Sequence, residues 1–388
     1  MSQKKVISTL PHTVIETLGG GTYGKVESIT SNGKPYAKKT YRKPDCPSAI
    51  REISFLNSVN HPNIIDIEKI IYNSGQISVI TELCEGTLDD YFQTSRSEIK
   101  MIEIFHSILC VLEFMHSKNF VHGDLNVYNV LMKDGVVKVA DFGMTRIGDK
   151  EALVTTNMCA PEVFMDSIYT TAIDIWGFGT IAFDCLTGHV FAEGDTWEKT
   201  SKSTLKRMGC PVNWKYRQYC KDEEKDVHET CVLVNYCARY KNTNQFNDML
   251  RRCFQFNDVD RPTASELLEY PMFKNLKKPE FKWLDSLPKK ITPRSEGTIM
   301  PQNPQFDKMN ALFPDADMQK LIHLSQLVSA VEDRFSLVTQ DMILSCYYIV
   351  SHLDDDGCVE GEKKKPIQNN HYVGTILCEF DFKFLQLD

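Results

Sequence analysis

The sequence lacks several features that mark particular classes of protein. It has 13 cysteines, but no two of them form a C-x-x-C pair, so neither a zinc site nor a redox dithiol of that kind is indicated. No run of 18 apolar residues occurs, and the first ten residues, MSQKKVISTL, lack the apolar segment of a secretion signal. We therefore expect an intracellular protein, cytoplasmic or nuclear, with reduced thiols and no membrane partner.

An excess of positive charge is also lacking. The chain has 44 Lys and Arg residues against 52 Asp and Glu residues, which gives a formal net charge of −8. Binding to nucleic acid or to anionic membranes needs clustered basic residues. The one dense basic run in the C-terminal third, Lys363 to Lys365, is interpreted as a solvated loop. We therefore expect no nucleic-acid partner.

The chain does have the length and apolar content for more than one globular domain. Its 388 residues, 42% of them hydrophobic, predict two or three domains at about 150 residues each. Residues 13–96 alternate short β-type runs with turns around one helical stretch, SAIREISFLNSV, and the following residues show helical periodicity. After Phe273 the sequence is rich in Pro, Lys and Ser, which is typical of a linker, and a second helical region is predicted at about residues 317–353.

A glycine-rich stretch, LGGGTYGKV, covers residues 18–26. Gly19, Gly21 and Gly24 form the pattern G-x-G-x-x-G, which by itself also fits a dinucleotide site or a plain glycine turn. In a dinucleotide fold the glycines open a helix, whereas here residues 25–29 continue as a predicted strand. The stretch therefore predicts a hairpin whose backbone N–H groups can approach phosphate oxygens, because glycine has no side chain to keep them away.

Two charged residues follow the glycine-rich stretch. Ala37 and Lys39 lie in YAKK, an A-x-K pattern in which the lysine neutralises nucleotide phosphates. A lysine needs a carboxylate to hold its flexible side chain in place, and Glu52 in the predicted helix is the candidate. Each residue alone is more often a surface charge, so the inference depends on the order of glycine loop, lysine and glutamate.

A third stretch, FVHGDLNVYNVL, covers residues 120–131. Asp124 can accept the proton of a substrate hydroxyl, and Asn129 can bind a magnesium ion. Val137 and Val139 alternate with Lys138 in a predicted buried strand that leads to Asp141. Two oxygen ligands together with nucleotide phosphates suit a hard cation such as Mg²⁺.

Further motifs follow in a familiar order. Ala160-Pro161-Glu162 precedes the helix start DIWGFG at Asp174, and Arg261 lies in VDRPT. Over residues 13–275 this order of motifs resembles that of the protein kinase family. The resemblance implies an α+β, two-lobed protein kinase fold, with a β-rich N-lobe and a helical C-lobe, that uses ATP and Mg²⁺ to phosphorylate serine or threonine in protein substrates.

The resemblance also implies a role for each matching residue. The catalytic set is Lys39, Glu52, Asp124 and Asn126, and the metal ligands are Asn129 and Asp141. The nucleotide-binding set is Leu18, Gly19, Gly20, Gly21, Thr22, Tyr23, Gly24, Lys25, Val26, Ala37, Lys39, Glu82 and Cys84.

Within the family, the chain most resembles the cyclin-dependent kinases. The stretch PSAIREISFLNSVNHPNI is similar to their cyclin-docking helix with one residue missing, and GTYG, YTTAIDIWGFG and FAEGD agree with them. In that group, cyclin docking moves the helix glutamate, here Glu52, onto the lysine, here Lys39.

The C-terminal region resembles part of a cyclin box. Its matching stretches are HLSQLVSAVEDRFSLV, which contains Asp333-Arg334-Phe335, then SCYYIVSHLDDD and TILCEFDFKFL. His352 and His371 stand where a cyclin has a lysine and a glutamate. The predicted domains are a kinase at 13–275, a linker at 276–305 and a partial cyclin-like domain at 306–388; an unrelated helical tail is the alternative. The partner of the docking helix is then this region of the same chain or a separate cyclin.

Several residues depart from the family pattern. Gly123 replaces the arginine that, in the family, binds a phosphothreonine. The activation segment, from Asp141 to Ala160, is several residues shorter than is usual in the family, with Lys150 near the place of that threonine. Both departures point to a segment held without phosphate. Cys159 replaces an arginine linked to proline-directed specificity, so preference for Ser/Thr-Pro sites is not expected.

Asn126 replaces the lysine that meets the γ-phosphate, and the loss of one transition-state cation costs on the order of 10²-fold in rate. A lysine introduced at this position is expected to raise activity or leave it unchanged. Two hypotheses follow: a slow but active serine/threonine kinase, and a nucleotide-binding pseudokinase that acts as a scaffold or decoy.

Overall fold

The computed structural model describes residues 6–7, 10–20, 24–42, 47–73, 76–147, 150–151, 160–164, 168–192, 194, 197–211, 214, 217 and 239–283. The predicted cyclin-like region lies outside the described residues, as do Gly21, Thr22 and Tyr23 of the glycine-rich stretch. The described chain forms two compact units, one from residues 1–59, 66–82 and Trp283, the other from residues 60–65 and 83–282. Within this described part, no helix is both long and apolar enough to cross a membrane.

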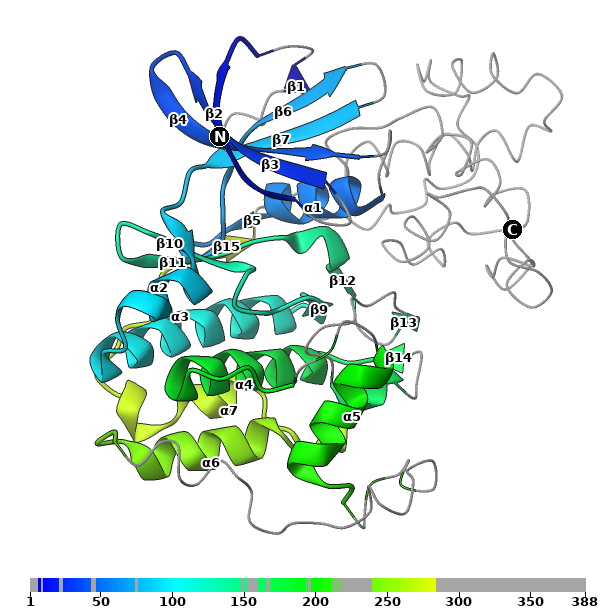
Figure 1. Cartoon of the computed structure of the whole chain (residues 1–388), viewed down its shortest axis with the longest axis vertical. Helices are drawn as coiled ribbons and strands as arrows, with labels where there is room; N and C mark the ends of the chain where they lie inside the picture. The colour runs from blue at the N-terminus through cyan, green and yellow to red at the C-terminus, as the bar shows by residue number, and fades with distance from the viewer. Residues whose placement is uncertain are drawn as a thin grey trace, which may run out of the picture. The chain divides into compact units, whose positions relative to one another are not determined.

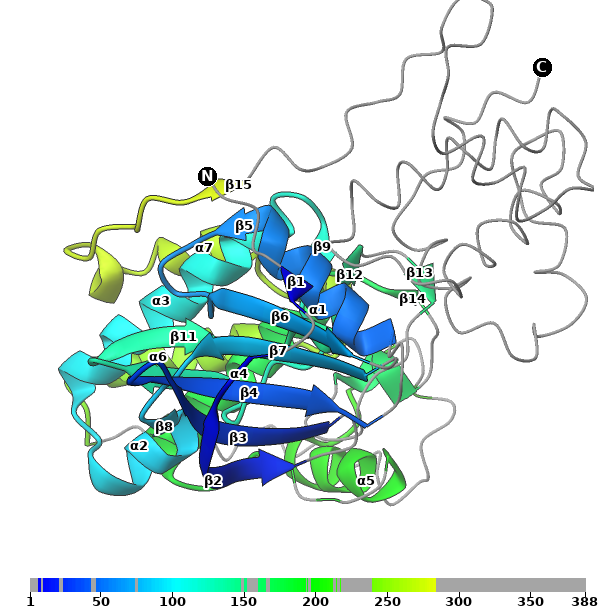
Figure 2. The ribbon, with the colours of Figure 1, turned by 90° about the horizontal axis from the view of Figure 1, so that it is seen from above.

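A six-stranded sheet makes up most of the first unit (Figure 1). Its strands, in spatial order, are β1 (Val6–Ile7), β6 (Ile67–Asn73), β7 (Gln76–Glu82), β4 (Lys34–Tyr41), β3 (Gly24–Ser31) and β2 (Thr13–Gly20). β1 runs parallel to β6 and every other neighbouring pair is antiparallel. Figure 2 shows β6, β7, β4 and β3 side by side. The predicted β-rich N-lobe is confirmed.

The turn between β3 and β4 follows from two residues. Asn32 and Gly33 have φ values of 51° and 74°, which are the left-handed values of a tight hairpin turn. Asn tolerates this conformation and glycine adopts it without steric cost. The turn aligns Val26 of β3 with Lys39 of β4 in the strand register.

One helix, α1 (Pro47–Ser58), packs against β6 and β7. Ala49, Ile53 and Leu56 are almost completely buried and recur at helical spacing, so they form the apolar stripe of the helix. Ile70 and Val79 are fully buried on the sheet. The helix that carries Glu52 is therefore anchored by hydrophobic packing on the sheet.

The second unit is predominantly helical, as predicted for the C-lobe. Its α-helices are α2 (Leu88–Thr94), α3 (Glu98–His116), α4 (Ala172–Thr187), α5 (Trp197–Met208), α6 (Thr243–Cys253) and α7 (Ala264–Leu268). Its 3-10 helices are η1 (Phe142–Met144), η2 (Pro161–Phe164), η6 (Asp258–Asp260) and η7 (Pro271–Phe273). Its short strands are β8 (Gly86–Thr87), β9 (Phe120–Val121), β10 (Val130–Lys133), β11 (Val136–Val139), β12 (Arg146–Ile147), β13 (Lys150–Glu151) and β14 (Ile168–Tyr169).

Helix α4 forms the centre of this unit and contacts both α3 and α6 (Figure 1). Nearly all of its residues are buried, including Trp176 and Phe178. A Cβ atom on Gly179 would lie 2.8 Å from the Cβ of Cys253, so glycine is needed where α4 meets α6. This buried helix is a rigid base for the Asp174 side chain in its first turn.

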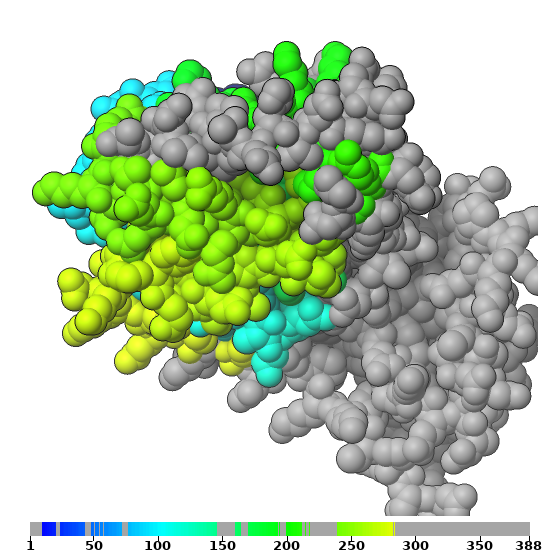
Figure 3. Space-filling view, turned by 90° about the horizontal axis from the view of Figure 1, so that it is seen from below, coloured from blue at the N-terminus to red at the C-terminus, as the bar shows by residue number. Residues whose placement is uncertain are grey.

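The predicted linker begins with residues that contact the second unit. Lys278 Nζ lies 2.7 Å from Glu113 Oε1, and the Phe281 ring lies 4.9 Å from Phe114 and is stacked 5.5 Å from His61. Burial lowers the pKa of His61 to about 4. Figure 3 shows residues 239–283, coloured yellow-green to yellow, gathered on one face of this unit. The domain boundary at residue 275 stays a prediction.

The chain then reaches β15 (Lys282–Trp283), which pairs with β5 (Val59–Asn60). In the first unit, the Trp283 ring lies edge-on to Phe55 of α1, with the ring centroids 6.2 Å apart. Composition alone predicts a linker here, because Pro and Lys dominate the stretch, but its aromatic residues act as anchors.

Candidate active site

The lysine and glutamate predicted as partners meet in the first unit. Lys39 Nζ lies 2.8 Å from Glu52 Oε2, and the two side chains are 15% and 5% exposed. Lys39 lies on β4 and Glu52 on α1, so the ion pair links the sheet to the helix. Removal of either partner of such a nearly buried pair leaves an uncompensated buried charge, which is strongly destabilising.

The described part of the glycine-rich stretch lies at the ends of β2 and β3. Gly19 pairs with Val26 and Gly20 with Lys25 in the strand register. A Cβ atom on Gly24 would lie 2.3 Å from the carbonyl oxygen of Thr40, so only glycine lets β3 approach β4 this closely. The predicted hairpin is present on both sides of residues 21–23.

Four other residues of the predicted nucleotide set, Leu18, Lys25, Ala37 and Glu82, lie on strands of the sheet. The Leu18 side chain is 47% exposed, and Lys25 Nζ donates to Glu27 Oε1 at 2.6 Å, a hydrogen bond that lowers the pKa of Glu27. Ala37 pairs with Thr81 across β4 and β7. Glu82 Oε1 accepts from the N–H of Asp66 at 3.2 Å. Cys84 is half-buried and belongs to the second unit.

In the second unit, Asp174 holds the backbone of the loop within residues 120–131, which carries the predicted base Asp124. Its Oδ2 accepts from the His122 N–H at 2.8 Å and its Oδ1 from the Gly123 N–H at 3.0 Å. His116 Nε2 lies 2.9 Å from the same Oδ2. Asp174 is 1% exposed, so its bonds to the loop compensate the burial of the carboxylate.

His122 fixes the next part of the loop from the inside. Its Nε2–H donates to the carbonyl oxygen of Ala140 at 3.1 Å, and its Nδ1 accepts from the N–H of Asp124 at 3.2 Å. These two bonds require the neutral imidazole that is protonated on Nε2. The ring is fully buried and lies 4.9 Å from Phe142. His122 therefore couples the position of Asp124 to the segment around Asp141.

Asp124 receives hydrogen bonds from two asparagines. Asn129 Nδ2 donates to Asp124 Oδ2 at 3.0 Å and to its carbonyl oxygen at 2.7 Å. Asn126 Nδ2 donates to Asp124 Oδ1 at 3.3 Å and to the same carbonyl oxygen at 3.1 Å. The two predicted catalytic or metal-binding amides therefore orient the predicted base.

The other end of the Asn126 amide holds the loop itself. Its Oδ1 accepts from the N–H groups of Tyr128 at 2.9 Å and Asn129 at 3.2 Å. Asparagine commonly caps turns in this way. The Asn126 side chain thus holds the backbone of the loop in place, a role that the sequence analysis did not predict.

Asp141 follows strand β11 in a left-handed backbone conformation, with φ of 60° and ψ of 68°. The strand is held by the segment at residues 60–65: the Val139 N–H donates to the Asn63 carbonyl oxygen at 2.8 Å, and Asn63 Nδ2 to the Val137 carbonyl oxygen at 3.1 Å. The Ala140 N–H donates to the carbonyl oxygen of Asn129 at 2.8 Å. The two predicted metal ligands therefore lie on adjoining pieces of backbone.

These ligands fit a magnesium ion. A carboxylate and a side-chain amide offer the oxygen ligands that Mg²⁺ prefers, with further coordination by water and phosphates. Lys39, a lysine held beside the carboxylate of Glu52, has the charge that suits nucleotide phosphates. The residues present are thus compatible with both ATP and Mg²⁺.

Two strand pairs and one ion pair hold the described parts of the activation segment. Arg146 of β12 pairs with Val121 of β9, and Lys150 of β13 pairs with Tyr169 of β14. Beyond these strands, Glu162 of η2 forms a bidentate ion pair with Arg261, with N–O distances of 2.6 and 2.5 Å. The segment is thus attached at its start, in β13 and at its end.

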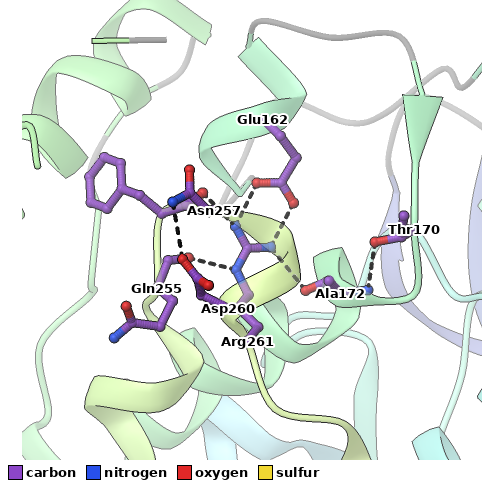
Figure 4. Close-up of polar contacts among 8 residues, drawn as sticks. Glu162, Thr170, Ala172, Gln255, Asn257, Asp260 and Arg261 are labelled. Atoms are coloured by element: carbon purple, nitrogen blue, oxygen red, sulfur yellow. Dashed lines mark hydrogen bonds and ion pairs between the residues drawn. The ribbon is translucent and has the colours of Figure 1, made fainter. Parts of the chain in front are cut away.

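Figure 4 shows how fully the Arg261 guanidinium is bonded. Besides Glu162, it donates to the carbonyl oxygens of Ala172 at 3.0 Å and Gln255 at 2.7 Å. Its side chain is 0% exposed, and its charged group lies 5.1 Å from the centroid of Trp176. Such planar, bidentate pairing explains why arginine, and not lysine, occupies this position.

The comparison with known families agrees with this geometry. The protein kinase domain family matches residues 12–273. The chain belongs to the protein kinase family. The β-sheet N-lobe and the helical C-lobe of this kinase are the two units described above.

Several proteins named as kinases are similar to this chain. A putative mitogen-activated protein kinase 14C from Drosophila melanogaster is 26% identical over 298 residues, which cover 71% of this kinase and 84% of the relative. A probable cell division protein kinase from Encephalitozoon cuniculi is 29% identical over 266 residues, 65% of this kinase and 93% of the relative. The serine/threonine-protein kinase ICK from Rattus norvegicus is 29% identical over 282 residues, 68% of this kinase and 45% of the relative.

Sequence reasoning missed two residues that support the kinase site. Asp174 was noted only as a helix start, although an aspartate in the first turn of a strongly apolar helix signals a buried polar contact. Tyr41 was not noted at all. Strand alternation places it on the same face as Lys39, and this is the signal that could have found it.

Proposed function

We propose that this protein is a slow, ATP-dependent serine/threonine protein kinase. The observation that carries the proposal is the Lys39–Glu52 ion pair, because a lysine held by a nearly buried carboxylate is arranged to bind nucleotide phosphates. The relatives named as kinases support the same class of activity.

Each side chain has a proposed task. Lys39 binds the α- and β-phosphates, and Glu52 keeps its flexible side chain in position. Asp124 accepts the proton of the substrate hydroxyl, with its carboxylate oriented by Asn126 and Asn129. Asn129 and Asp141 are proposed to bind Mg²⁺, which would neutralise charge on the transferring phosphoryl group.

The low expected rate follows from Asn126. A lysine at this position would place a cation near the γ-phosphate, and removal of one such group costs on the order of 10²-fold. The Asn126 amide is engaged by Asp124 on one side and by two backbone N–H groups on the other. These bonds support a positioning role in place of the missing charge.

We also propose that the activation segment needs no phosphate. Gly123 offers no guanidinium to bind one, and the β12–β9 and β13–β14 pairs attach parts of the segment through backbone hydrogen bonds. The start of the segment is therefore held by strand pairing, and its end by the Glu162–Arg261 pair.

Activation by the cyclin-like region is a further part of the proposal. The docking-helix sequence lies in α1, and one relative is named as a probable cell division protein kinase. The stretch from residue 284 to residue 305 can span roughly 25 Å at ~5–6 Å × √n, so the region is at high effective concentration. A separate cyclin is the alternative partner.

The alternative function is a nucleotide-binding pseudokinase that acts as a scaffold. Gly123 and Asn126 favour it, since both replace residues that active members use. Lys39→Met and Asp141→Asn variants separate the two functions when phosphate transfer to a generic acceptor protein and nucleotide binding are both measured. The kinase proposal predicts that each substitution abolishes transfer. If wild type binds nucleotide with Mg²⁺ but its transfer equals that of both variants, the scaffold function holds.

A further inference from the structure

A buried tyrosine contacts both members of the Lys39–Glu52 pair. Tyr41 is the last residue of β4, and it is 0% exposed. Its hydroxyl donates to Glu52 Oε2, the same oxygen that accepts from Lys39. One carboxylate oxygen therefore receives a charged donor and a neutral donor from the same strand.

The Tyr41 ring makes a second contact with the pair. Lys39 Nζ lies 5.2 Å from the ring centroid, within the range of a cation–π interaction. Residues two apart on a strand share one face, so Lys39 and Tyr41 approach Glu52 from the same side. The three side chains form one connected group.

The chain around Tyr41 is closely packed. Gly24 is its partner in the β3–β4 register, and a Cβ atom on Gly24 would lie 3.2 Å from the Cα of Tyr41 and closer still to Thr40. On α1, Ala49 and Ile53 are buried at 0% and 1% exposure. The Tyr41 side chain thus lies in a closely packed part of the unit.

A buried carboxylate without donors is costly, and a hydrogen bond to such a carboxylate is costly to lose. If α1 moved so that Glu52 left Lys39, Tyr41 would lose the same acceptor at the same moment. The tyrosine therefore adds its own penalty to any arrangement in which the ion pair is broken. Charge-assisted hydrogen bonds of this kind are stronger than neutral ones.

We propose that Tyr41 is a positioning residue that holds Glu52 on Lys39 from within the sheet, without a partner protein. The effect of Tyr41 on catalysis rests on the proposed kinase function. Its effect on the position of α1 does not, because that effect is present in the protein without nucleotide. Tyr41 thereby helps to hold Glu52 on Lys39, which the family resemblance attributes to cyclin docking.

The test uses the full chain with Tyr41→Phe, which keeps the ring and removes only the hydroxyl. Tyr36→Phe is the matched control, because Tyr36 lies on the same strand but on the opposite face, packed against Ile29 and Ile80. The first measurement is hydrogen exchange of α1 without nucleotide. We expect α1 to exchange about three- to tenfold faster in Tyr41→Phe, with α4 unchanged and the control like wild type.

The second measurement is the Kd of a fluorescent ATP analogue with Mg²⁺. Tyr41→Phe should raise this Kd about three- to tenfold, and Tyr36→Phe by less than about twofold. A double-mutant cycle with Glu52→Ala tests whether Tyr41 acts through Glu52. In the Glu52→Ala background, Tyr41→Phe should change the Kd by less than about twofold. A purely structural tyrosine would give the same loss in both backgrounds.

The possible outcomes separate this inference from the proposed function. Wild-type exchange in α1 of Tyr41→Phe overturns the positioning role, and so does faster exchange in both α1 and α4. An undiminished effect in the Glu52→Ala background also overturns it. If wild type binds no nucleotide, the proposed kinase function fails, while the exchange of α1 still decides the role of Tyr41.

Discussion

The N–H of Gly123 donates to Asp174 Oδ1 at 3.0 Å while Gly123 has a φ of +79°. L-residues with a side chain are strained in this region, typically by about 1–2 kcal/mol. A Cβ atom at this position would also lie 3.2 Å from the carbonyl oxygen of Met144. Glycine therefore lets the loop keep its bond to Asp174 without strain, in addition to removing the family's arginine.

Gly123→Ala should lower the free energy of unfolding by about 1–2 kcal/mol, because it adds both strain and a close contact with Met144. Gly135→Ala is the matched control: its φ is +73° in the same unit, but the nearest atom to an added Cβ is Lys100 Nζ at 3.9 Å. Chemical denaturation should show the larger loss for Gly123→Ala. Equal losses would mean that only the backbone conformation matters at Gly123.

The hydrogen bonds of Asn126 predict different effects for its substitution by alanine, aspartate or lysine. Asn126→Ala removes all of its hydrogen bonds to Asp124, Tyr128 and Asn129, so kcat should fall about tenfold. Asn126→Asp keeps the acceptor for the two N–H groups and should retain the stability of wild type more closely. Steady-state kinetics and thermal unfolding measure the two effects. Wild-type kcat in Asn126→Ala would show that Asn126 does not orient Asp124.

Asn126→Lys should raise kcat or leave it unchanged, since it restores a cation. It also removes the acceptor for the N–H groups of Tyr128 and Asn129, so the unfolding temperature should drop. The hydrogen bonds of Asn126 thus predict a loss of stability in Asn126→Lys that the sequence does not indicate. An Asn126→Lys protein as stable as wild type would contradict the capping role.

Asp184 predicts a pH dependence of stability. Burial raises the pKa of Asp184 to about 7, although the Phe191 N–H donates to its Oδ1. In the unfolded chain the group ionises near 4, so the folded state binds the extra proton between about pH 4 and pH 7. The stabilising contribution is complete below pH 4 and is lost as the pH rises through about 7.

Asp184→Asn keeps the acceptor for Phe191 and removes the ionisation. The variant should therefore gain stability relative to wild type as the pH rises from 5 to 8, on the order of a few kcal/mol at most. Denaturant unfolding at several pH values measures this difference. A difference that does not change with pH would show that Asp184 ionises normally in the folded protein.

Much of the fold could be predicted from local patterns in the sequence. Strand β3, helix α1 and the buried stripe of α3 all correspond to predicted segments, because their apolar spacing and glycine signals are local. The order of the kinase motifs also identified the candidate site residues. Their proposed roles in nucleotide and metal binding stay predictions.

The contacts that hold the site residues in place could not be predicted from local sequence patterns. Tyr41 reaches Glu52 only because Gly24 and α1 bring chain segments together that are apart in sequence. The sequence indicates Asn126 only as a missing lysine, since nothing in DLNVYN shows which N–H groups its side chain faces. Phe281 lies in a stretch whose composition resembles a linker, yet it stacks on His61.

Truncation tests the proposed activation by the C-terminal region. A chain that ends at Trp283 keeps the contacts of Phe281 with His61 and of Trp283 with Phe55, whereas a chain that ends at Lys278 loses both. If residues 306–388 activate the kinase, the chain ending at Trp283 should lose activity at unchanged stability, and those residues added separately should partly restore it. Full activity of that chain would mean that the region is not an activator.

Phosphate transfer by the purified protein tests the central claim most directly. The measurement compares wild type with Asp124→Asn, using Mg²⁺-ATP and generic acceptor proteins, because this substitution removes the proposed base with a minimal change in shape. The account predicts slow transfer to serine or threonine by wild type and at least about a hundredfold less by Asp124→Asn. Equal transfer by the two proteins under every metal condition would contradict it.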